Sequence, residues 1–196
     1  MCRLIWSLPV LTAKKPSSCV IPLHKHETPG HLWITWDQYH GAIENLASRV
    51  YESGWAFDQV VCIARGGLRV GDVFSRLFKC PLAILSASSY REAAGTQRGE
   101  LDIAQHISSS AGPVAGRVLL VDDLVDSGIT LERVQTHLST QFPAVTEVRS
   151  AVIWYKACSA MKPDYYLEYL ADSPWIHQPF ELYDEMSPQA LVGKNK

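Results

Sequence analysis

The sequence has no apolar run long enough to cross a membrane, which argues against a membrane-spanning helix. It also lacks an excess of charge of either sign, because 18 Lys and Arg face 20 Asp and Glu. Proteins that bind nucleic acid through a broad basic field need more positive charge, so we expect no nucleic-acid partner. The five cysteines show no Cys-x-x-Cys spacing, and their odd number favours a reducing compartment. We therefore predict a cytoplasmic protein.

Two common phosphate-binding patterns are also missing. The sequence contains no G-x-x-x-x-G-K-[ST] and no G-x-G-x-x-G after a strand, which argues against a P-loop or a dinucleotide-binding turn. Residues 118–131 instead read VLLVDDLVDSGITL. Four apolar residues without alternation predict a buried parallel strand. Asp122 and Asp123 come next, and we expect both at the exposed carboxyl end of that strand, where open α/β sheets bind ligands.

Residues 126–130, which read DSGIT, form a short loop before a predicted helix. Gly128 allows close backbone approach, Ser127 and Thr130 offer hydroxyls, and the amides of a helix start favour an anion. Carboxylates beside an anion site indicate a ligand that carries a phosphate, sugar hydroxyls and Mg²⁺. An ordinary strand-to-helix turn is the alternative.

Strands and helices alternate along the chain, which predicts an α/β fold with a parallel sheet. The predicted strands are residues 59–64, 82–87, 118–121 and 148–155. Thr35 and Gln38 form a capping box before the first helix, whose predicted inner face is Tyr39, Ile43, Leu46, Ala47 and Val50. The next helix, residues 67–78, should bury Val70, Val73, Phe74 and Leu77.

Two segments show little periodicity. Residues 1–31 are predicted to be an N-terminal extension of uncertain structure, followed by a single domain over residues 32–196. Residues 88–116 are rich in Ser, Gly, Ala, Gln and Arg, and we expect a mobile excursion there. Cys62 and Cys158 lie in apolar runs, where a free cysteine is usually a small buried side chain.

Residues 118–131 resemble the ribose-phosphate signature of the type I phosphoribosyltransferases, which bind phosphoribosyl pyrophosphate. The resemblance implies a mostly parallel, twisted sheet flanked by helices, with a flexible hood loop and a small C-terminal base-binding hood. It implies that Asp122 and Asp123 hold the ribose hydroxyls and Mg²⁺. The 5′-phosphate would bind to Ser127, Gly128, Ile129 and Thr130. Asp126 would face N7 of a purine and move its proton.

Two further segments resemble other parts of the same family. Ala64-Arg65-Gly66-Gly67 resembles its pyrophosphate loop, which implies that Arg65 and Gly66 bind pyrophosphate and that the Ala64–Arg65 peptide is cis. Residues 88–101 resemble its catalytic hood, from which Arg91 and Arg98 would bring positive charge to the leaving group. Taken alone, a glycine turn and a solvated polar loop are equally ordinary interpretations.

The last third of the chain resembles the xanthine-guanine branch of the family. Lys156 follows the fourth predicted strand, and residues 175–181 read Trp-Ile-x-Gln-Pro-aromatic-acid. The resemblance implies that Lys156, Trp175 and Ile176 bind the base of a 6-oxopurine (guanine, xanthine or hypoxanthine) in a homodimeric or homotetrameric enzyme of purine salvage. It covers residues 33–181 and departs from the family in the first 31 residues, in residues 91–98 and in the longer segment 156–163. A surface lysine and a core or interface tryptophan are the plain alternatives.

Two other functions fit parts of this pattern. A regulator of the same fold would bind phosphoribosyl pyrophosphate as a signal, but it would not need Lys156, Trp175 and the hood. A pyrimidine-using transferase is disfavoured by the same lysine and tryptophan. The preference among guanine, xanthine and hypoxanthine depends on main-chain groups near purine position 2, and the sequence leaves that order open.

Overall fold

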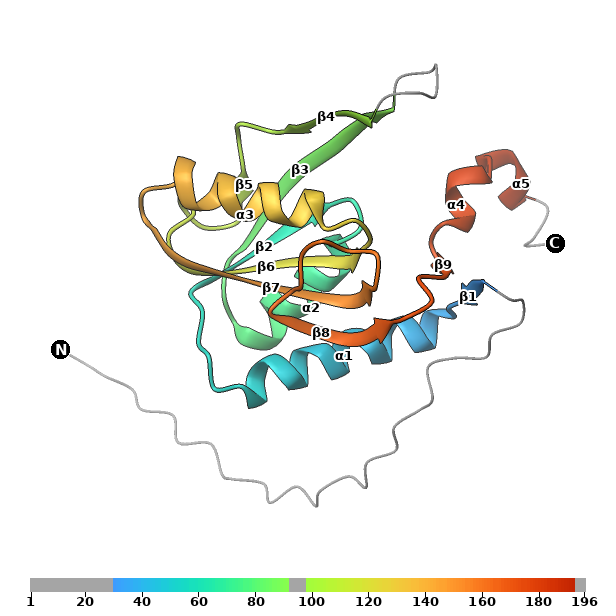
Figure 1. Cartoon of the computed structure of the whole chain (residues 1–196), viewed down its shortest axis with the longest axis horizontal. Helices are drawn as coiled ribbons and strands as arrows, with labels where there is room; N and C mark the ends of the chain where they lie inside the picture. The colour runs from blue at the N-terminus through green and yellow to red at the C-terminus, as the bar shows by residue number, and fades with distance from the viewer. Residues whose placement is uncertain (1–29, 92–97, 193–196) are drawn as a thin grey trace.

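The protein is described by a computed structural model that covers the backbone of residues 30–91 and 98–192, and the side chains of these ranges outside residues 88–101. Its main sheet has seven strands in the order β4-β3-β2-β6-β7-β8, with β5 beside β3 (Figure 1). They are β2 (Gln59–Ala64), β3 (Leu82–Arg91), β4 (Arg98–Ile103), β5 (Ser108–Ser109), β6 (Gly116–Val125), β7 (Val145–Lys156) and β8 (Tyr165–Leu170). From β3 to β8 all neighbours run parallel, which confirms the predicted α/β class.

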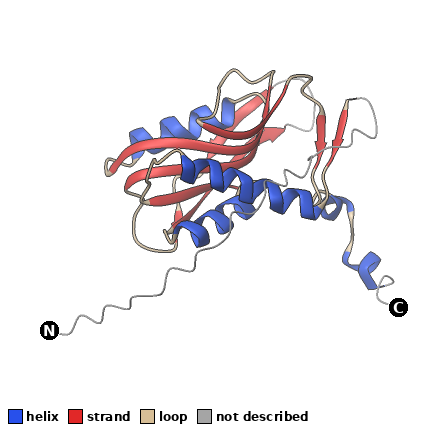
Figure 2. Cartoon of the chain, turned by 90° about the horizontal axis from the view of Figure 1, so that it is seen from below, coloured by secondary structure: helices blue, strands red, loops and turns tan. Residues whose placement is uncertain are grey.

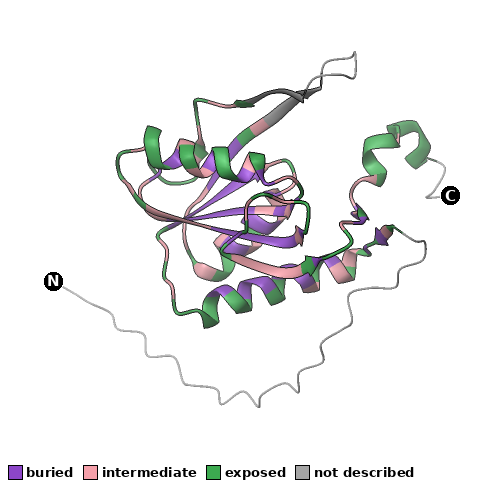
Figure 3. Ribbon diagram, in the orientation of Figure 1, coloured by how far each residue is buried: buried purple, intermediate pink, exposed green. Residues whose placement is uncertain are grey.

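Helices cover both faces of this sheet (Figure 2). On one face lie α1 (Trp36–Glu52) and α2 (Leu68–Phe78), and on the other lies α3 (Ile129–Gln141). Side chains alternate along a strand, so neighbouring residues enter different cores. Val60 and Leu119 pack with α1 and α2, whereas Val61 and Leu120 pack with α3. The central strands are therefore buried along most of their length (Figure 3).

The local signals of the first two helices hold with one exception. Thr35 and Gln38 form both bonds of the predicted capping box, and every predicted inner residue of α1 is buried. In α2, Val70 and Phe74 are buried, but Leu77 is 57% exposed, so that part of the prediction is wrong. Phe78 takes the inner position instead, because its ring packs against those of Phe74 and Phe57.

Strand β6 is longer than the apolar run that predicted it. Leu124 and Val125 still pair with Trp154 and Tyr155 of β7, so the two acids lie inside the strand. Asp123 is only 8% exposed, and the prediction that both carboxylates are solvent-exposed is wrong for this residue. The reason is that β6 continues to pair with β7, so the strand extends beyond the apolar run of residues 118–121.

Residues 88–116, where we expected a mobile excursion, include β4, β5, the end of β3 and the first residue of β6. β4 and β5 both run antiparallel to β3, and Ala87 lies opposite Ile103. Val114 is buried in the α3-side core. The two strands were not predicted because they lie at or beside the edge of the sheet, where polar strands are common and apolar alternation is weak, and the mobility of this segment stays a prediction. Residues 92–97, within the predicted hood, lie outside the described residues.

A small second sheet joins a strand near the start of the described residues to a strand near their end. β1 (His31–Trp33) pairs in parallel with β9 (Trp175–His177), and the short helices α4 (Leu182–Glu185) and α5 (Pro188–Val192) follow (Figure 1). Leu32 and Ile176 are partners in this sheet, and both enter the core beneath α1. Within the described residues, no helix has the length and apolar character to span a membrane. The boundary between extension and domain stays a prediction.

Candidate active site

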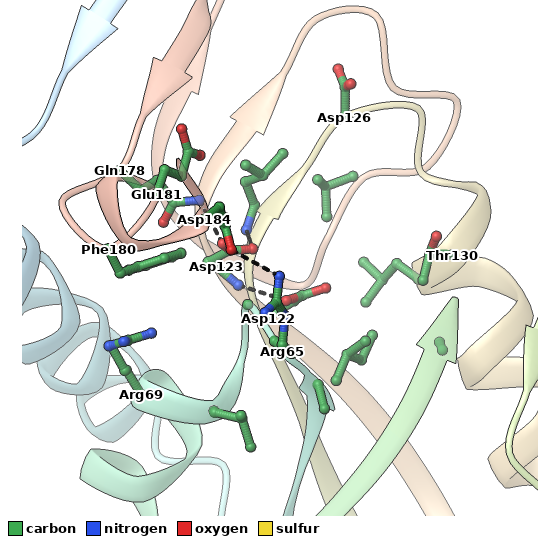
Figure 4. Close-up of a pocket in the computed structure, with 18 of the residues that line it drawn as sticks. Arg65, Arg69, Asp122, Asp123, Asp126, Thr130, Gln178, Phe180, Glu181 and Asp184 are labelled. Atoms are coloured by element: carbon green, nitrogen blue, oxygen red, sulfur yellow. Dashed lines mark hydrogen bonds and ion pairs between the residues drawn. The ribbon is translucent and has the colours of Figure 1, made fainter. Parts of the chain in front are cut away.

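A cavity of about 760 Å³ opens where β2 and β6 end and where α2 and α3 begin. Its walls come from three segments that are distant in sequence, residues 63–69, residues 122–131 and residues 178–184, together with Ala87 of β3 (Figure 4). The carboxyl ends of neighbouring parallel strands meet at one edge of a sheet, which is why the first two segments converge. The predicted pyrophosphate loop and ribose-phosphate segment thus share one cavity.

The two acids of β6 are held by hydrogen bonds. The main-chain N–H of Asp123 donates to Asp122 Oδ1 at 2.9 Å, and that of Leu124 donates to Asp123 Oδ1 at 2.7 Å. Gln178 Nε2 donates to Asp123 Oδ2 at 2.5 Å. Burial and the charge of Asp123 raise the pKa of Asp122 well above its usual range. Burial also raises the pKa of Asp123, against the lowering effect of the bond from Gln178. A cation or hydroxyl donors in the cavity would relieve this repulsion.

The glycines of the predicted pyrophosphate loop lie directly against these acids. The Ala64–Arg65 peptide is cis, as the resemblance implied. A Cβ on Gly66 would lie 2.6 Å from Asp123 Oδ1, and one on Gly67 would lie 2.6 Å from the carbonyl oxygen of Val121. Side chains cannot fit there, so the loop needs glycine at both positions. The Arg65 guanidinium is exposed and lies 3.1 Å from Asp184 Oδ1.

The segment after β7 packs against the predicted phosphate loop. Gly128 caps α3 with a φ of 83°, and an added Cβ would lie 2.5 Å from Ser159 Oγ. The Ala160 N–H donates to the Ser127 carbonyl at 3.1 Å. Residues 156–163, where the sequence departs from its relatives, therefore support the loop. No local sequence signal indicated that role.

Replacing Gly128 with alanine should destabilise the protein and weaken binding of phosphate-bearing ligands. A left-handed residue other than glycine costs roughly 1–2 kcal/mol, and overpacking typically costs about 1–3 kcal/mol more. Thermal unfolding and calorimetric titration with phosphoribosyl pyrophosphate would measure both effects. Gly41→Ala is the matched control, because a Cβ at that position of α1 meets nothing within 4 Å. An unchanged Tm and affinity in Gly128→Ala would contradict the packing described for this loop.

Asp126 lies at the mouth of the cavity with two donors beside it. Lys156 Nζ lies 3.3 Å from Asp126 Oδ1, and the Cys158 thiol also donates to that oxygen at 3.3 Å. The Lys156 side chain is 8% exposed and that of Asp126 is 63% exposed. Cys158 is exposed in the turn after β7, so its predicted burial is wrong, whereas Cys62 is buried, and burial raises its pKa to about 12. The structure thus joins the predicted proton-moving acid to the predicted base-binding lysine.

Trp175 and Ile176 do not line the cavity. Trp175 is 59% exposed on β9, and Ile176 is buried, so only main-chain atoms of Ile176 are available to a ligand. Arg98 is the first residue of β4, and its side chain, like that of Arg91, lies outside those that the structure describes.

Several cavity residues were not assigned by the sequence: Arg69, Gln178, Phe180, Glu181, Tyr183 and Asp184. Gln178 is part of the Trp-Ile-x-Gln-Pro motif, and this motif was the sequence signal that could have identified it as a site residue. The guanidinium carbon of Arg69 lies 4.3 Å from the centre of the Phe180 ring. Together these residues form the wall opposite the phosphate loop.

The side chains of the cavity can be compared with the ligands that a metal ion requires. Within residues 30–91 and 98–192, no three His, Cys, Asp or Glu side chains converge into a metal site. Mg²⁺ does not require such a cage, because it usually takes one or two carboxylates and completes its shell with water and substrate phosphates. Asp122 and Asp123, beside an anion-binding loop, fit that pattern.

Several known proteins are similar to this chain in sequence and in fold. Residues 35–185 match the phosphoribosyl transferase domain family. The chain is 30% identical over 162 residues to a xanthine-guanine phosphoribosyltransferase of Gluconobacter oxydans, which covers 79% of this chain and 87% of that protein. A purine phosphoribosyltransferase structure from Pyrococcus horikoshii aligns with a TM-score of 0.64 at 27% identity, over 77% of this chain and 93% of that one. A xanthine-guanine-hypoxanthine phosphoribosyltransferase of Helicobacter pylori has the same fold, with a TM-score of 0.60 at 23% identity over 79% and 97% of the two chains.

Proposed function

Because the chain belongs to the phosphoribosyltransferase family, we propose that it transfers the phosphoribosyl group of phosphoribosyl pyrophosphate to a ring nitrogen of a 6-oxopurine. The products would be the nucleoside monophosphate and pyrophosphate, which makes the reaction one of purine salvage. The observation that carries the proposal is the single cavity that joins an acid pair, a phosphate loop and the Arg65 loop. No observation favours a purely regulatory role, and the contact between Asp126 and Lys156 supports chemistry on a base.

The donor would lie along the edge formed by β2 and β6. Ser127, Gly128, Ile129 and Thr130 would hold the 5′-phosphate, since the main-chain amides at the start of a helix such as α3 favour an anion. Asp122 and Asp123 would accept hydrogen bonds from the ribose hydroxyls. Their carboxylates would also hold Mg²⁺, which when bound neutralises charge on the pyrophosphate.

The leaving group would lie against the glycine loop. Arg65 and the main chain of Gly66 would bind pyrophosphate, and Arg98 would add a second positive charge. Arg65 is paired with Asp184, so pyrophosphate binding would exchange one anion for another. The contact is exposed, and such ion pairs are weak enough to be displaced.

The base would meet Lys156, Trp175 and Asp126. Lys156 would donate to oxygen at purine position 6, Trp175 would stack on the ring, and the main chain of Ile176 would meet the substituent at position 2. Charge develops at the anomeric carbon as pyrophosphate leaves, and Asp126 would accept the proton from N7. Positioning and electrostatics are sufficient for this displacement, since no covalent intermediate is required.

A panel of nucleobases tests the function directly. Purified protein is incubated with phosphoribosyl pyrophosphate, Mg²⁺ and guanine, xanthine, hypoxanthine, adenine, uracil or orotate, and nucleotide formation is measured. The proposal requires turnover with at least one 6-oxopurine. Donor binding without turnover of any base would favour the regulator, and turnover of uracil or orotate alone would favour the pyrimidine enzyme.

The two acids of β6 should act through the donor. Asp122→Ala or Asp123→Ala should raise the donor KM or impair Mg²⁺-dependent turnover, because ribose hydroxyls and Mg²⁺ lose an oxygen ligand. Base binding measured without donor should change less. Asp172→Ala, at an exposed acid that does not line the cavity, is the matched control. Wild-type donor affinity and turnover in both variants would reject the ribose and Mg²⁺ role.

We also propose that the enzyme works in the cytoplasm as a homodimer or homotetramer. Large apolar side chains are exposed on β1, β9, α4 and α5, namely Trp33, Trp175, Leu182, Tyr183, Leu191 and Val192. Exposed apolar groups that gather on one part of a surface often mark an interface. Light scattering coupled to size-exclusion chromatography would give the mass, and a monomer at micromolar concentration would contradict this part of the proposal.

A further inference from the structure

Gln178 lines the cavity but has no part in the chemistry described so far. It follows β9 directly, is 5% exposed, and donates from Nε2 to Asp123 Oδ2 at 2.5 Å (Figure 4). A glutamine buried this deeply is uncommon, because its amide must find partners away from water. Its partner here is the carboxylate that the sequence placed at the ribose.

Asp123 is fixed from three directions. The Leu124 N–H donates to one carboxylate oxygen from within β6, and Gln178 donates to the other from the C-terminal segment. Gly66 lies so close on the third side that a Cβ there would overlap the carboxylate. Of these three constraints, only the one from Gln178 is made by a side chain, so a single substitution can remove it.

The surroundings of Asp123 also contain polar atoms without partners. Gln178 Oε1 and the Tyr39 hydroxyl are both buried and make no hydrogen bond within the described residues. Burial raises the pKa of Tyr39, and the nearby charge of Asp123 adds to the effect. Buried polar atoms without partners are rare in native proteins. The Gln178 amide thus uses its donor on Asp123 while its buried acceptor has no partner among the described residues, which indicates a side chain kept for Asp123 rather than for packing.

We propose that Gln178 is a positioning residue of the donor site, which orients Asp123 toward the ribose and couples donor binding to base binding. The inference rests on the proposed function. Gln178 immediately follows the strand Trp175–His177, which carries the residues expected to meet the base. A base that fixes this strand would therefore also fix Asp123. Such coupling is reciprocal, so the donor would strengthen base binding by the same factor.

The test compares Gln178→Met with the wild type in the full-length chain. Methionine preserves size and removes both amide groups. Titration with Mg²⁺ and phosphoribosyl pyrophosphate should show a donor Kd raised roughly 10–100-fold, since hydrogen bonds to charged groups are among the stronger ones. The kcat at saturating donor should change much less. Gln141→Met is the matched control, because that glutamine is exposed at the end of α3.

The coupling needs a second titration. 9-Deazaguanine carries carbon in place of the accepting ring nitrogen, so it can bind beside the donor without reacting. It should tighten donor binding to the wild type and to Gln141→Met, but not to Gln178→Met. Equal tightening in all three proteins would overturn the coupling.

Two further results keep the inference separate from protein stability and from the proposed function. Gln178→Glu has the shape of the wild type but places a carboxylate against that of Asp123, so it should weaken donor binding at least as much as Gln178→Met, and the Tm of each variant is measured alongside its donor Kd. If the wild type forms nucleotide while Gln178→Met, Gln178→Glu and Gln141→Met all bind the donor as the wild type does, the inference is overturned. If the wild type binds the donor but uses no base, the proposed function fails, and the donor titrations still decide the role of Gln178.

Discussion

Asp126→Asn should lower kcat by roughly 10²–10⁴-fold, the usual contribution of a general acid or base, while donor binding stays near that of the wild type. The amide keeps an oxygen at the position of Oδ1, which accepts from both Lys156 and Cys158 in the native site. The local arrangement is therefore retained, and the lost property is the ability to take up a proton. Because the native side chain is 63% exposed, the substitution should hardly alter the free energy of unfolding.

Single-turnover kinetics with donor and a 6-oxopurine would measure this effect on the chemical step. Asp172→Asn is the control, since it makes the same change at an exposed acid that does not line the cavity. A chemical rate close to that of the wild type in Asp126→Asn would show that this acid is only a loop residue.

The second large effect concerns the choice of base. A 6-oxopurine presents an acceptor at position 6 and adenine presents a donor, whereas the Lys156 ammonium has three donors and no acceptor. One of these donors can remain with Asp126 while another meets the base oxygen. Adenine would instead place two donors face to face beside a lysine that is only 8% exposed. Sites that hydrogen-bond a required group can reject analogues without it by about 10⁴–10⁵-fold, so we expect adenine to be a very poor substrate.

Lys156→Met should lose most of this discrimination, mainly because kcat/KM falls for the 6-oxopurines. The ratio of kcat/KM for hypoxanthine and adenine isolates the position-6 group, since neither base has a substituent at position 2. Lys162→Met is the matched control, as that lysine is exposed and lies over the Tyr166 ring. A wild-type enzyme that prefers adenine at saturating donor would overturn both the role of Lys156 and the proposed substrate class.

Local sequence patterns predicted the parts of the fold that depend on local chemistry. The capping box of Thr35 and Gln38 fixed the start of α1, and the apolar run of β2 gave its bounds, because both signals lie within a few residues. The three-residue strands β1 and β9 have no such signal, since each is defined only by its partner. The prediction that Leu77 is buried was wrong for a similar reason, because the contact between Phe57 and Phe78 decides which side of α2 faces the core.

The candidate site also has a part that the sequence predicted and a part that it did not. Parallel strands bring the Arg65 loop and the ribose-phosphate segment to one edge, so their convergence followed from the predicted topology. The contact between Gln178 and Asp123 joins residues 55 positions apart, and no periodicity or motif spacing encodes it. The burial of Asp123 was also missed, because it depends on how far β7 continues beside β6.

The small sheet of β1 and β9 has a consequence for how the donor site is anchored. His31 and His177, which share a 2.9 Å contact across it, are 146 positions apart in the chain, and the sheet has only three paired positions. Leu32 and Ile176 of these strands are buried in the core beneath α1, so the two strands cannot part without exposing core side chains. Gln178 follows β9 directly, and the apolar contacts that hold the small sheet therefore also keep its amide beside Asp123.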